Sequence, residues 1–159
     1  MPLTGPALGA LRILLVEDSP EDAELMSEQM LDAGLEARFE RVESEVELRQ
    51  ALAAFVPDIV LSDLSMPGFS GDDALRIVRE TSPEVPFIFV SGTMGEENAV
   101  AALQKGANDY IIKHLPARLP SAVARAIREA RSAVERARVE TELMRAQRLE
   151  SLSLLAAGL

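Results

Sequence analysis

The stretch PDIVLSDLSMPGFSG, residues 57–71, decides the fold class that this chain is expected to adopt. It starts with a short apolar run that ends at Asp63, and a loop then leads to a helix expected from about Gly71. A continuous apolar run of this length is typical of a strand that is buried on both faces of a parallel sheet. The stretch therefore predicts a buried strand, a polar strand end and a helix, in that order.

The same succession of strand and helix repeats along the chain. Five units in about 110 residues favour an α/β fold, a flavodoxin-like, doubly wound, five-stranded parallel sheet of order 2-1-3-4-5; a closed eight-stranded barrel needs roughly twice that length. An extended C-terminal helix follows the fifth strand. The expected strands cover residues 11–16, 37–42, 58–61, 86–90 and 110–112, and the helices between them cover about 19–33, 44–55, 71 onward and 95–105.

Composition narrows the function classes. The net charge of −10 is uneven, because residues 1–117 carry 8 Lys/Arg against 21 Asp/Glu, whereas residues 118–159 carry 8 Arg against 5 Glu. An acidic body repels phosphate backbones, and the tail arginines alternate with glutamates as on a solvated helix face, so we expect no nucleic-acid binding. The sequence has no cysteine and no apolar run long enough for a membrane span, which favours a cytoplasmic protein. Residues 1–10 are interrupted by proline and glycine and predict a flexible leader.

Polar side chains stand at the ends of four predicted strands. In this topology, ligands bind beyond the carboxyl ends of the strands, at the point where the strand order reverses. Three clustered carboxylates need a counter-charge, and oxygen ligands without His or Cys select a hard divalent cation, for which Mg²⁺ is the abundant choice. The strand-end residues are Glu17 and Asp18 on the first strand, Asp63 on the third, Ser91 on the fourth and Lys113 on the fifth.

A carboxylate nucleophile, a Lewis acid and a lysine are the parts that receive a phosphoryl group. The plainer interpretation is that strand-end acids only cap the next helix. However, Ser19 already fills that role after Asp18, and Asp63 is too far from the helix near Gly71 to cap it. Asp63 also follows a buried run, where an uncompensated charge is costly. These points favour a phosphoryl-accepting site centred on Asp63.

Four segments of the chain resemble the response-regulator receiver family of two-component signalling, and the resemblance spans about residues 11–130. The segments are LLVED at 14–18, VLSDLSMPG at 60–68 with Gly71 after it, VSGT at 90–93 and GANDYIIK at 106–113. The resemblance implies that Asp63 accepts a phosphoryl group from a histidine kinase or a histidine phosphotransfer protein. It also implies that Ser91 hydrogen-bonds this group and that Lys113 forms an ion pair with it.

The resemblance further implies a magnesium site and a switch. Asp18 would bind Mg²⁺ directly, and Glu17, where the family more often has aspartate, would act mostly through water. Asp63 and the backbone carbonyl of Ser65 would be the other ligands. Tyr110 would be the switch aromatic, turning inward when the serine at the end of the fourth strand moves toward the phosphoryl group. Such a domain is not an enzyme beyond its own phosphotransfer and dephosphorylation.

The tail predicts an association between two chains. The 36 residues from Pro120 to Leu155 would form about 54 Å of helix, whereas a 120-residue domain is only about 35 Å across. Small and apolar residues form a heptad seam that falters at Arg148 and resumes shifted by one residue; its members are Val123, Ile127, Ala130, Val134, Ala137, Thr141 and Met144, then Leu149, Leu152 and Ala156. We therefore expect a receiver domain over 11–130 and a coiled-coil signalling helix over 131–159 that forms a parallel homodimer. Residues 148–159 resemble the start of a histidine-kinase dimerisation helix, which implies a hybrid sensor histidine kinase with an N-terminal receiver, cut before its phospho-accepting His. An ordinary coiled-coil ending is the alternative.

Three other kinds of protein have to be compared with this interpretation. A pseudo-receiver docks partners without phosphorylation, and the presence of every expected site residue argues against it. Aspartyl-phosphate hydrolases are recognised by an Asp-x-Asp pattern. In this chain Ser65 stands where the second aspartate of that pattern is expected. A flavodoxin needs a phosphate loop rich in hydroxyls and glycine after the first strand, where Glu17 and Asp18 would instead repel the flavin phosphate.

Overall fold

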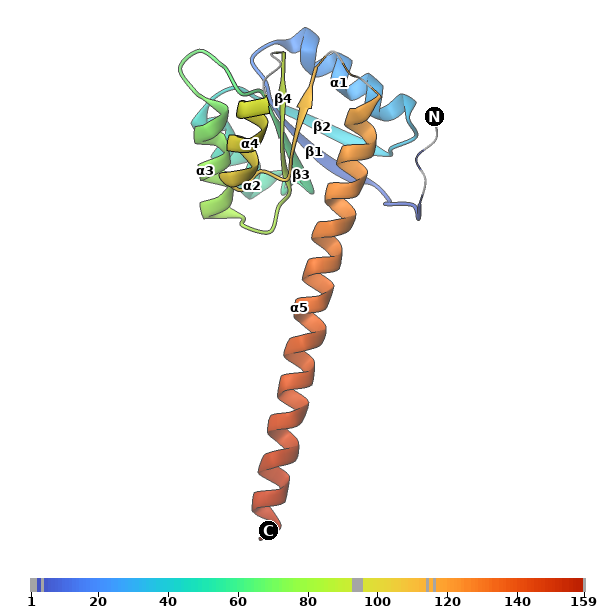
Figure 1. The fold of residues 1–159 in the computed structure, drawn as a ribbon, viewed down its shortest axis with the longest axis vertical. Helices are drawn as coiled ribbons and strands as arrows, with labels where there is room; N and C mark the ends of the chain where they lie inside the picture. The colour runs from blue at the N-terminus through green and yellow to red at the C-terminus, as the bar shows by residue number, and fades with distance from the viewer. Residues whose placement is uncertain (1–2, 4, 93–95, 114, 116, 159) are drawn as a thin grey trace.

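The computed structural model describes residues 3, 5–92, 96–113, 115 and 117–158. It contains a five-stranded parallel sheet of order β2-β1-β3-β4-β5, which confirms the predicted flavodoxin-like fold and strand order (Figure 1). The expected helix start at residue 95 lies outside the described residues. The elements are β1 (Leu11–Val16), α1 (Pro20–Asp32), β2 (Ala37–Val42), α2 (Glu45–Ala54), β3 (Ile59–Ser62), α3 (Gly71–Thr81), β4 (Phe87–Ser91), α4 (Glu96–Gln104), β5 (Asp109–Ile112) and α5 (Arg118–Ala156).

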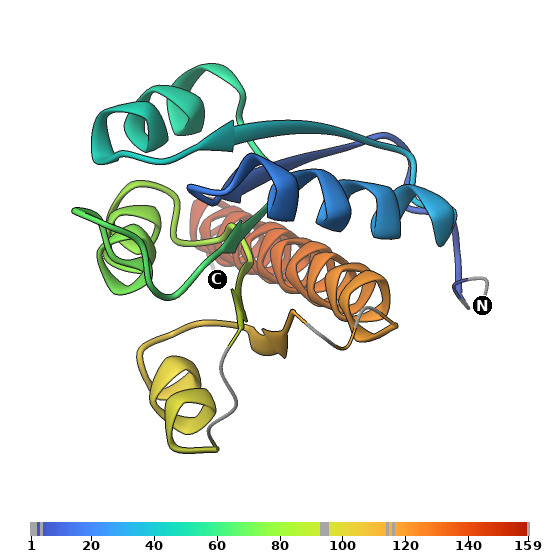
Figure 2. The same ribbon diagram turned by 90° about the horizontal axis from the view of Figure 1, so that it is seen from above.

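Helices cover both faces of the sheet, as the continuous apolar strands require. Seen from above, α1 and α5 lie on one side of the sheet, and α2, α3 and α4 lie on the other (Figure 2). Two apolar clusters result: Ile13 and Leu15 of β1 face α1 and α5, and Leu14 faces the opposite layer. The alternation of side chains along a strand explains this division, and burial of both faces explains why the strands read as apolar runs.

Register between the strands aligns their carboxyl ends. Val16, the last residue of β1, is paired with Ser62, the last residue of β3. The backbone N–H of Asp63 donates to the carbonyl of Val16 over 2.9 Å, so the chain is held in sheet-like contact one residue past β3. The polar residues that follow β1 and β3 therefore leave the sheet side by side.

The last helix, α5, begins at Arg118, two residues before the proline at which the sequence predicted its start. Proline is tolerated in a first helical turn, where its missing N–H has no intrahelical partner. Buried side chains of α5 end at Ile127, and every described residue from 131 to 158 is exposed. The rest of the helix projects beyond the receiver body (Figure 1).

The segment before β1 has contacts with α5. The guanidinium of Arg128 donates to the carbonyl of Pro6 over 3.0 Å, and that of Arg131 donates to the carbonyl of Leu8 over 2.8 Å. Leu3 and Leu8 also pack against the apolar cluster between the sheet and α5. Residues 3, 6 and 8 of the predicted leader thus have contacts with the body of the protein, and the flexibility of residues 1–10 stays a prediction.

None of the helices in the described part of the chain is both long and apolar enough to cross a membrane.

Candidate functional site

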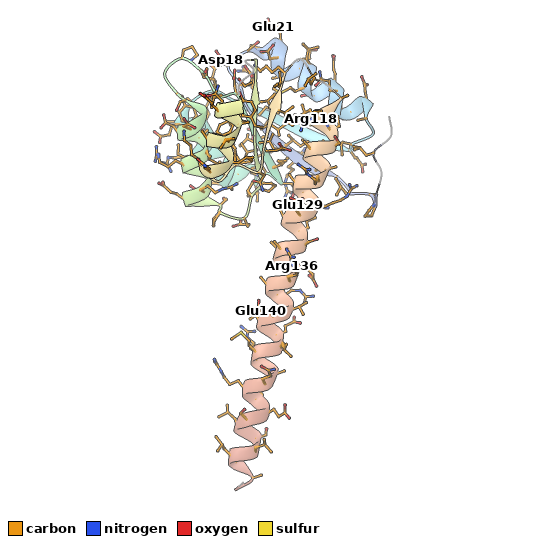
Figure 3. All side chains as sticks on the ribbon, viewed as in Figure 1. Asp18, Glu21, Arg118, Glu129, Arg136 and Glu140 are labelled. Carbon is orange, nitrogen blue, oxygen red and sulfur yellow. The ribbon has the colours of Figure 1, made fainter. Side chains whose placement is uncertain are left out.

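Three carboxylates meet where β1 and β3 end. Each of Glu17, Asp18 and Asp63 offers an oxygen that lies within 4.8 Å of the other two. Glu17 is buried, at 1% exposed, whereas Asp18 is exposed and the Asp63 side chain is 13% exposed. Figure 3 shows Asp18 at the end of the molecule opposite the projecting part of α5, which carries Arg136 and Glu140. The structure thus brings together the three acids that the sequence singled out.

Lys113, directly after β5, supplies positive charge to this cluster. Its ammonium Nζ lies 2.9 Å from Glu17 Oε2 and 3.3 Å from Asp63 Oδ2. The backbone N–H of Lys113 donates to the carbonyl of Ser91 over 2.8 Å, which fixes the strand end from which the side chain reaches across. Two strands separate β5 from β1 in the sheet order, so this reach depends on the full length of the lysine side chain.

A fourth carboxylate, Asp22 of α1, was not singled out from the sequence. Its Oδ2 lies 2.7 Å from Lys113 Nζ, which is the shortest of the three distances between this ammonium and a carboxylate oxygen. In the sequence, an acid in a first helical turn is already explained by the favourable interaction of negative charge with the helix N-terminus. Only the spacing of Asp22, three residues past the N-cap Ser19, could have suggested a side chain directed at the site.

Burial and charge shift the ionisation of this group of residues. Burial raises the pKa of the Glu17 carboxyl, and the hydrogen bond from Lys113 opposes that shift only in part. For Lys113, burial by itself lowers the pKa, but hydrogen bonds to Asp22 and Glu17 and the nearby negative charges outweigh it, so the pKa is raised. The lysine is therefore a cation at neutral pH and the fixed counter-charge of the acids.

A cavity of about 440 Å³ opens beside the cluster. Asp63, Ser65, Ser91 and Lys113 are among its polar lining residues, and apolar residues of α1, of β4 and β5 and of the chain entering α5 also line it. Ser91 is 4% exposed, and the N–H of Ser65 makes a long, 3.4 Å contact with Asp63 Oδ1. Both serines therefore line the same cavity as Asp63, and their roles toward a phosphoryl group and a metal ion stay predictions.

Tyr110, the predicted switch residue, lies in the strand β5 that leads to Lys113. Its side chain is buried, at 7% exposed, and packs in the apolar cluster that includes Phe87 and Phe89. The sequence-based expectation was a ring that turns inward on phosphorylation. The movement stays a prediction, and the single position that the structure shows for this side chain is buried.

Gly71, the first residue of α3, allows the backbone to pass close behind Asp63. A Cβ at this position would overlap the backbone oxygen of Asp63 and would lie 2.9 Å from Leu64 Cα and 2.8 Å from a ring carbon of Phe89. The N–H of Gly71 also donates to the carbonyl of Leu64 over 3.0 Å. The glycine therefore keeps the loop after Asp63 closed against the start of α3.

Replacing Gly71 with alanine should lower the free energy of unfolding by about 1–3 kcal/mol, because the backbone atoms that the new methyl group meets cannot rotate away. Urea denaturation of the two proteins measures this difference. Gly92→Ala is the matched control, since a Cβ on Gly92 meets no described atom within 4 Å and its backbone is not in the left-handed region. Equal stability of Gly71→Ala and wild type would contradict the close packing at this position.

The donor set fits a magnesium ion. All the candidate ligands are oxygen atoms, and carboxylates at one point are the ligands that hard divalent cations prefer. The buried Glu17 carboxylate has one oxygen within 3.1 Å of the N–H of Ser19 and the other facing Lys113, so its orientation is set by the protein. Asp18 remains open to solvent at the surface of the same cluster.

Comparison with known proteins shows the family of this fold and site. The family model of the response regulator receiver domain matches residues 13–124. The chain belongs to the response-regulator receiver family, whose members are signalling domains of two-component systems and not classical enzymes. The match begins two residues into β1, ends within the buried part of α5, and leaves the projecting part of that helix outside.

Particular relatives agree with this assignment. FleR, a response regulator protein of Pseudomonas aeruginosa, is 34% identical over 109 residues, which cover 69% of this chain and 23% of FleR. The luminescence regulatory protein LuxO of Vibrio campbellii is 32% identical over 117 residues, covering 73% of this chain and 25% of LuxO. A crystal structure of the signal receiver domain ascribed to a LuxO repressor of Vibrio parahaemolyticus aligns with a TM-score of 0.69 at 28% identity, covering 78% of this chain and 95% of that one. The chain thus spans about a quarter of the length of these two curated relatives.

Proposed function

We propose that the chain accepts a phosphoryl group on Asp63 from the phosphohistidine of a histidine kinase or a histidine phosphotransfer protein. One observation carries the proposal: the Asp63 carboxylate lines the cavity and lies close to two other carboxylates and to the ammonium of Lys113. Treatment with a small phosphodonor in the presence of Mg²⁺, followed by intact mass measurement, tests it.

The transfer needs little from the protein beyond position and charge. A carboxylate oxygen of Asp63 forms a new bond to phosphorus while the N–P bond of the donor breaks, and the electron pair of that bond stays on the imidazole nitrogen. Lys113 and the Ser91 hydroxyl are placed to neutralise and hydrogen-bond the phosphoryl oxygens. Glu17, Asp18, Asp63 and the backbone carbonyl of Ser65 would hold Mg²⁺, which supplies Lewis-acid stabilisation of the phosphoryl charge when bound.

Asp18→Asn should weaken Mg²⁺ binding by about tenfold or more, because it removes one formal charge from a site whose affinity depends on the charge of its ligands. Titration calorimetry with MgCl₂ measures the change. Asp32→Asn, the same substitution at the exposed end of α1, is the control and should keep the wild-type affinity. If Asp18→Asn binds as tightly as the wild type, Asp18 is not a ligand.

The route from the site to the rest of the molecule follows β4 and β5. Ser91 and Lys113 end these neighbouring strands, and Tyr110 lies in β5 next to Phe89 of β4. A phosphoryl group of about −1.5 to −2 charge would draw the serine and the lysine toward Asp63. In the proposed switch, phosphorylation favours the inward position of the tyrosine over an outward one, and this shift alters the face formed by α4, β5 and α5.

We infer that α5 carries this signal to a second chain, as a parallel coiled coil over residues 131–159. The exposed apolar side chains of its projecting part support the inference.

The similarity of residues 148–159 to a kinase dimerisation helix supports a hybrid histidine kinase as the parent protein. The acidic receiver body supports protein partners and not nucleic acid, and a cytoplasmic location remains the prediction from the sequence.

A further inference from the structure

Lys113 has one carboxylate partner that the phosphorylation chemistry does not account for. Its ammonium is shared among Glu17, Asp63 and Asp22, and the contact with Asp22, at 2.7 Å, is the shortest. Asp22 belongs to α1 and is separated from Lys113 by 91 positions in the sequence, so the fold creates this pair. Asp22 also lines the cavity beside Asp63.

The start of α1 does not use the Asp22 carboxylate. The N-cap is Ser19, whose Oγ accepts from the backbone N–H of Asp22 over 3.3 Å. The carboxylate that contacts the cap is that of Glu21, at 3.2 Å from Ser19 Oγ. The helix cap thus accounts for the side chain of Glu21 and for the backbone N–H of Asp22. The contact that the structure shows for the Asp22 carboxylate is the one with Lys113.

The three partners of the ammonium differ in depth. The side chain of Glu17 is 1% exposed, that of Asp63 is 13% exposed and that of Asp22 is 41% exposed. Asp22 is therefore the most solvent-exposed of the three partners, and it lines the same cavity as Asp63. We propose that Asp22 is a positioning residue that holds Lys113 outward and competes with the phosphoryl group for its ammonium, which slows phosphorylation of Asp63.

The competition follows from charge. An ammonium shared among three carboxylates is less available to the oxygens of an incoming phosphoryl group. Removing the charge of Asp22 leaves Lys113 between Glu17 and Asp63, both of which stay in the site. The lysine is then directed more fully at the group transferred to Asp63. This inference rests on the proposed phosphorylation of Asp63.

The test compares phosphorylation rates of the full 159-residue chain with acetyl phosphate and Mg²⁺, followed by intact mass spectrometry. Asp22→Asn should react about two- to fivefold faster than the wild type, the range that a partly exposed ion pair supports. Asp22→Glu, which keeps the charge, should restore a rate close to that of the wild type. Glu21→Gln is the matched control, because it removes the same charge one residue away from a side chain that contacts Ser19.

A double substitution shows whether the effect passes through the lysine. In a Lys113→Met background, Asp22→Asn should no longer raise the rate. An unchanged or slower Asp22→Asn protein, or an equal acceleration in Glu21→Gln, would overturn the positioning role while phosphorylation of the wild type still stood. Undiminished acceleration in the Lys113→Met background would overturn it as well. A wild-type chain that gains no phosphoryl mass would remove the proposed function and this inference together.

Discussion

Asp63→Asn should abolish the gain of one phosphoryl mass that the wild-type chain shows after treatment with a small phosphodonor and Mg²⁺. An amide is a poor nucleophile. Asp63 is the member of the three-carboxylate cluster that both lines the cavity and forms an ion pair with Lys113. Intact mass spectrometry reads the outcome directly. A mutant that still gains the phosphoryl mass would place the acceptor at another residue.

Two controls separate a loss of chemistry from a loss of fold. Asp32→Asn, at the other end of α1 and about 18 Å from the start of that helix, should be phosphorylated like the wild type. The thermal unfolding midpoint of Asp63→Asn should not fall, because Lys113 keeps Glu17 and Asp22 as partners and one clustered carboxylate is neutralised. An unfolded Asp63→Asn protein would show that the carboxylate is needed for structure.

The sheet and its order were predictable because the strands are buried on both faces. Such strands are short apolar runs with abrupt polar ends, and the predicted limits of β2, residues 37–42, agree with the structure. The end of β3 was predicted one residue early, since Ser62 is polar and yet 1% exposed within the strand. The polar ends of β1 and β3 likewise predicted that Glu17, Asp18 and Asp63 lie together, as they do.

The features that were not predicted depend on side chains meeting across long sequence distances. Asp22 reaches Lys113 only in the folded chain, and apart from its spacing from Ser19 nothing local distinguishes it from Glu21. The segment before β1 has the composition of a loose leader, but its carbonyls accept hydrogen bonds from Arg128 and Arg131 of α5. The inward position of Tyr110 is likewise a property of packing, which a sequence pattern does not encode.

Removing the helix after Glu135 should convert a dimer into a folded monomer that still accepts phosphate. Residues 131–156 would extend about 39 Å from the receiver as helix, too far to be covered by their own domain. Their large apolar side chains are half exposed or more, at Val134, Val139, Leu143, Met144, Leu149, Leu152, Leu154 and Leu155. A single exposed helix of this kind gains stability mainly by packing against a partner.

Sedimentation equilibrium measures the change. Alanine and threonine at several seam positions bury little area, so we expect a dissociation constant of about one micromolar for the full chain. Tens of micromolar is about ten times the expected dissociation constant or more, so a full chain that stays monomeric at that concentration would refute the dimer. An unchanged dimer after truncation would place the interface on the receiver.

Cysteine cross-linking distinguishes a parallel from an antiparallel pair. The chain contains no cysteine, so a single introduced thiol can form a disulfide only with its copy in the second chain. In a parallel coiled coil the two Leu152 positions face each other across the seam, whereas an antiparallel pair places them at opposite ends. Leu152→Cys should therefore form a disulfide-linked dimer on oxidation, and Glu150→Cys, on the outer face of the same turn, should not. Equal cross-linking of both variants, or of neither in a chain that sediments as a dimer, would contradict the parallel arrangement.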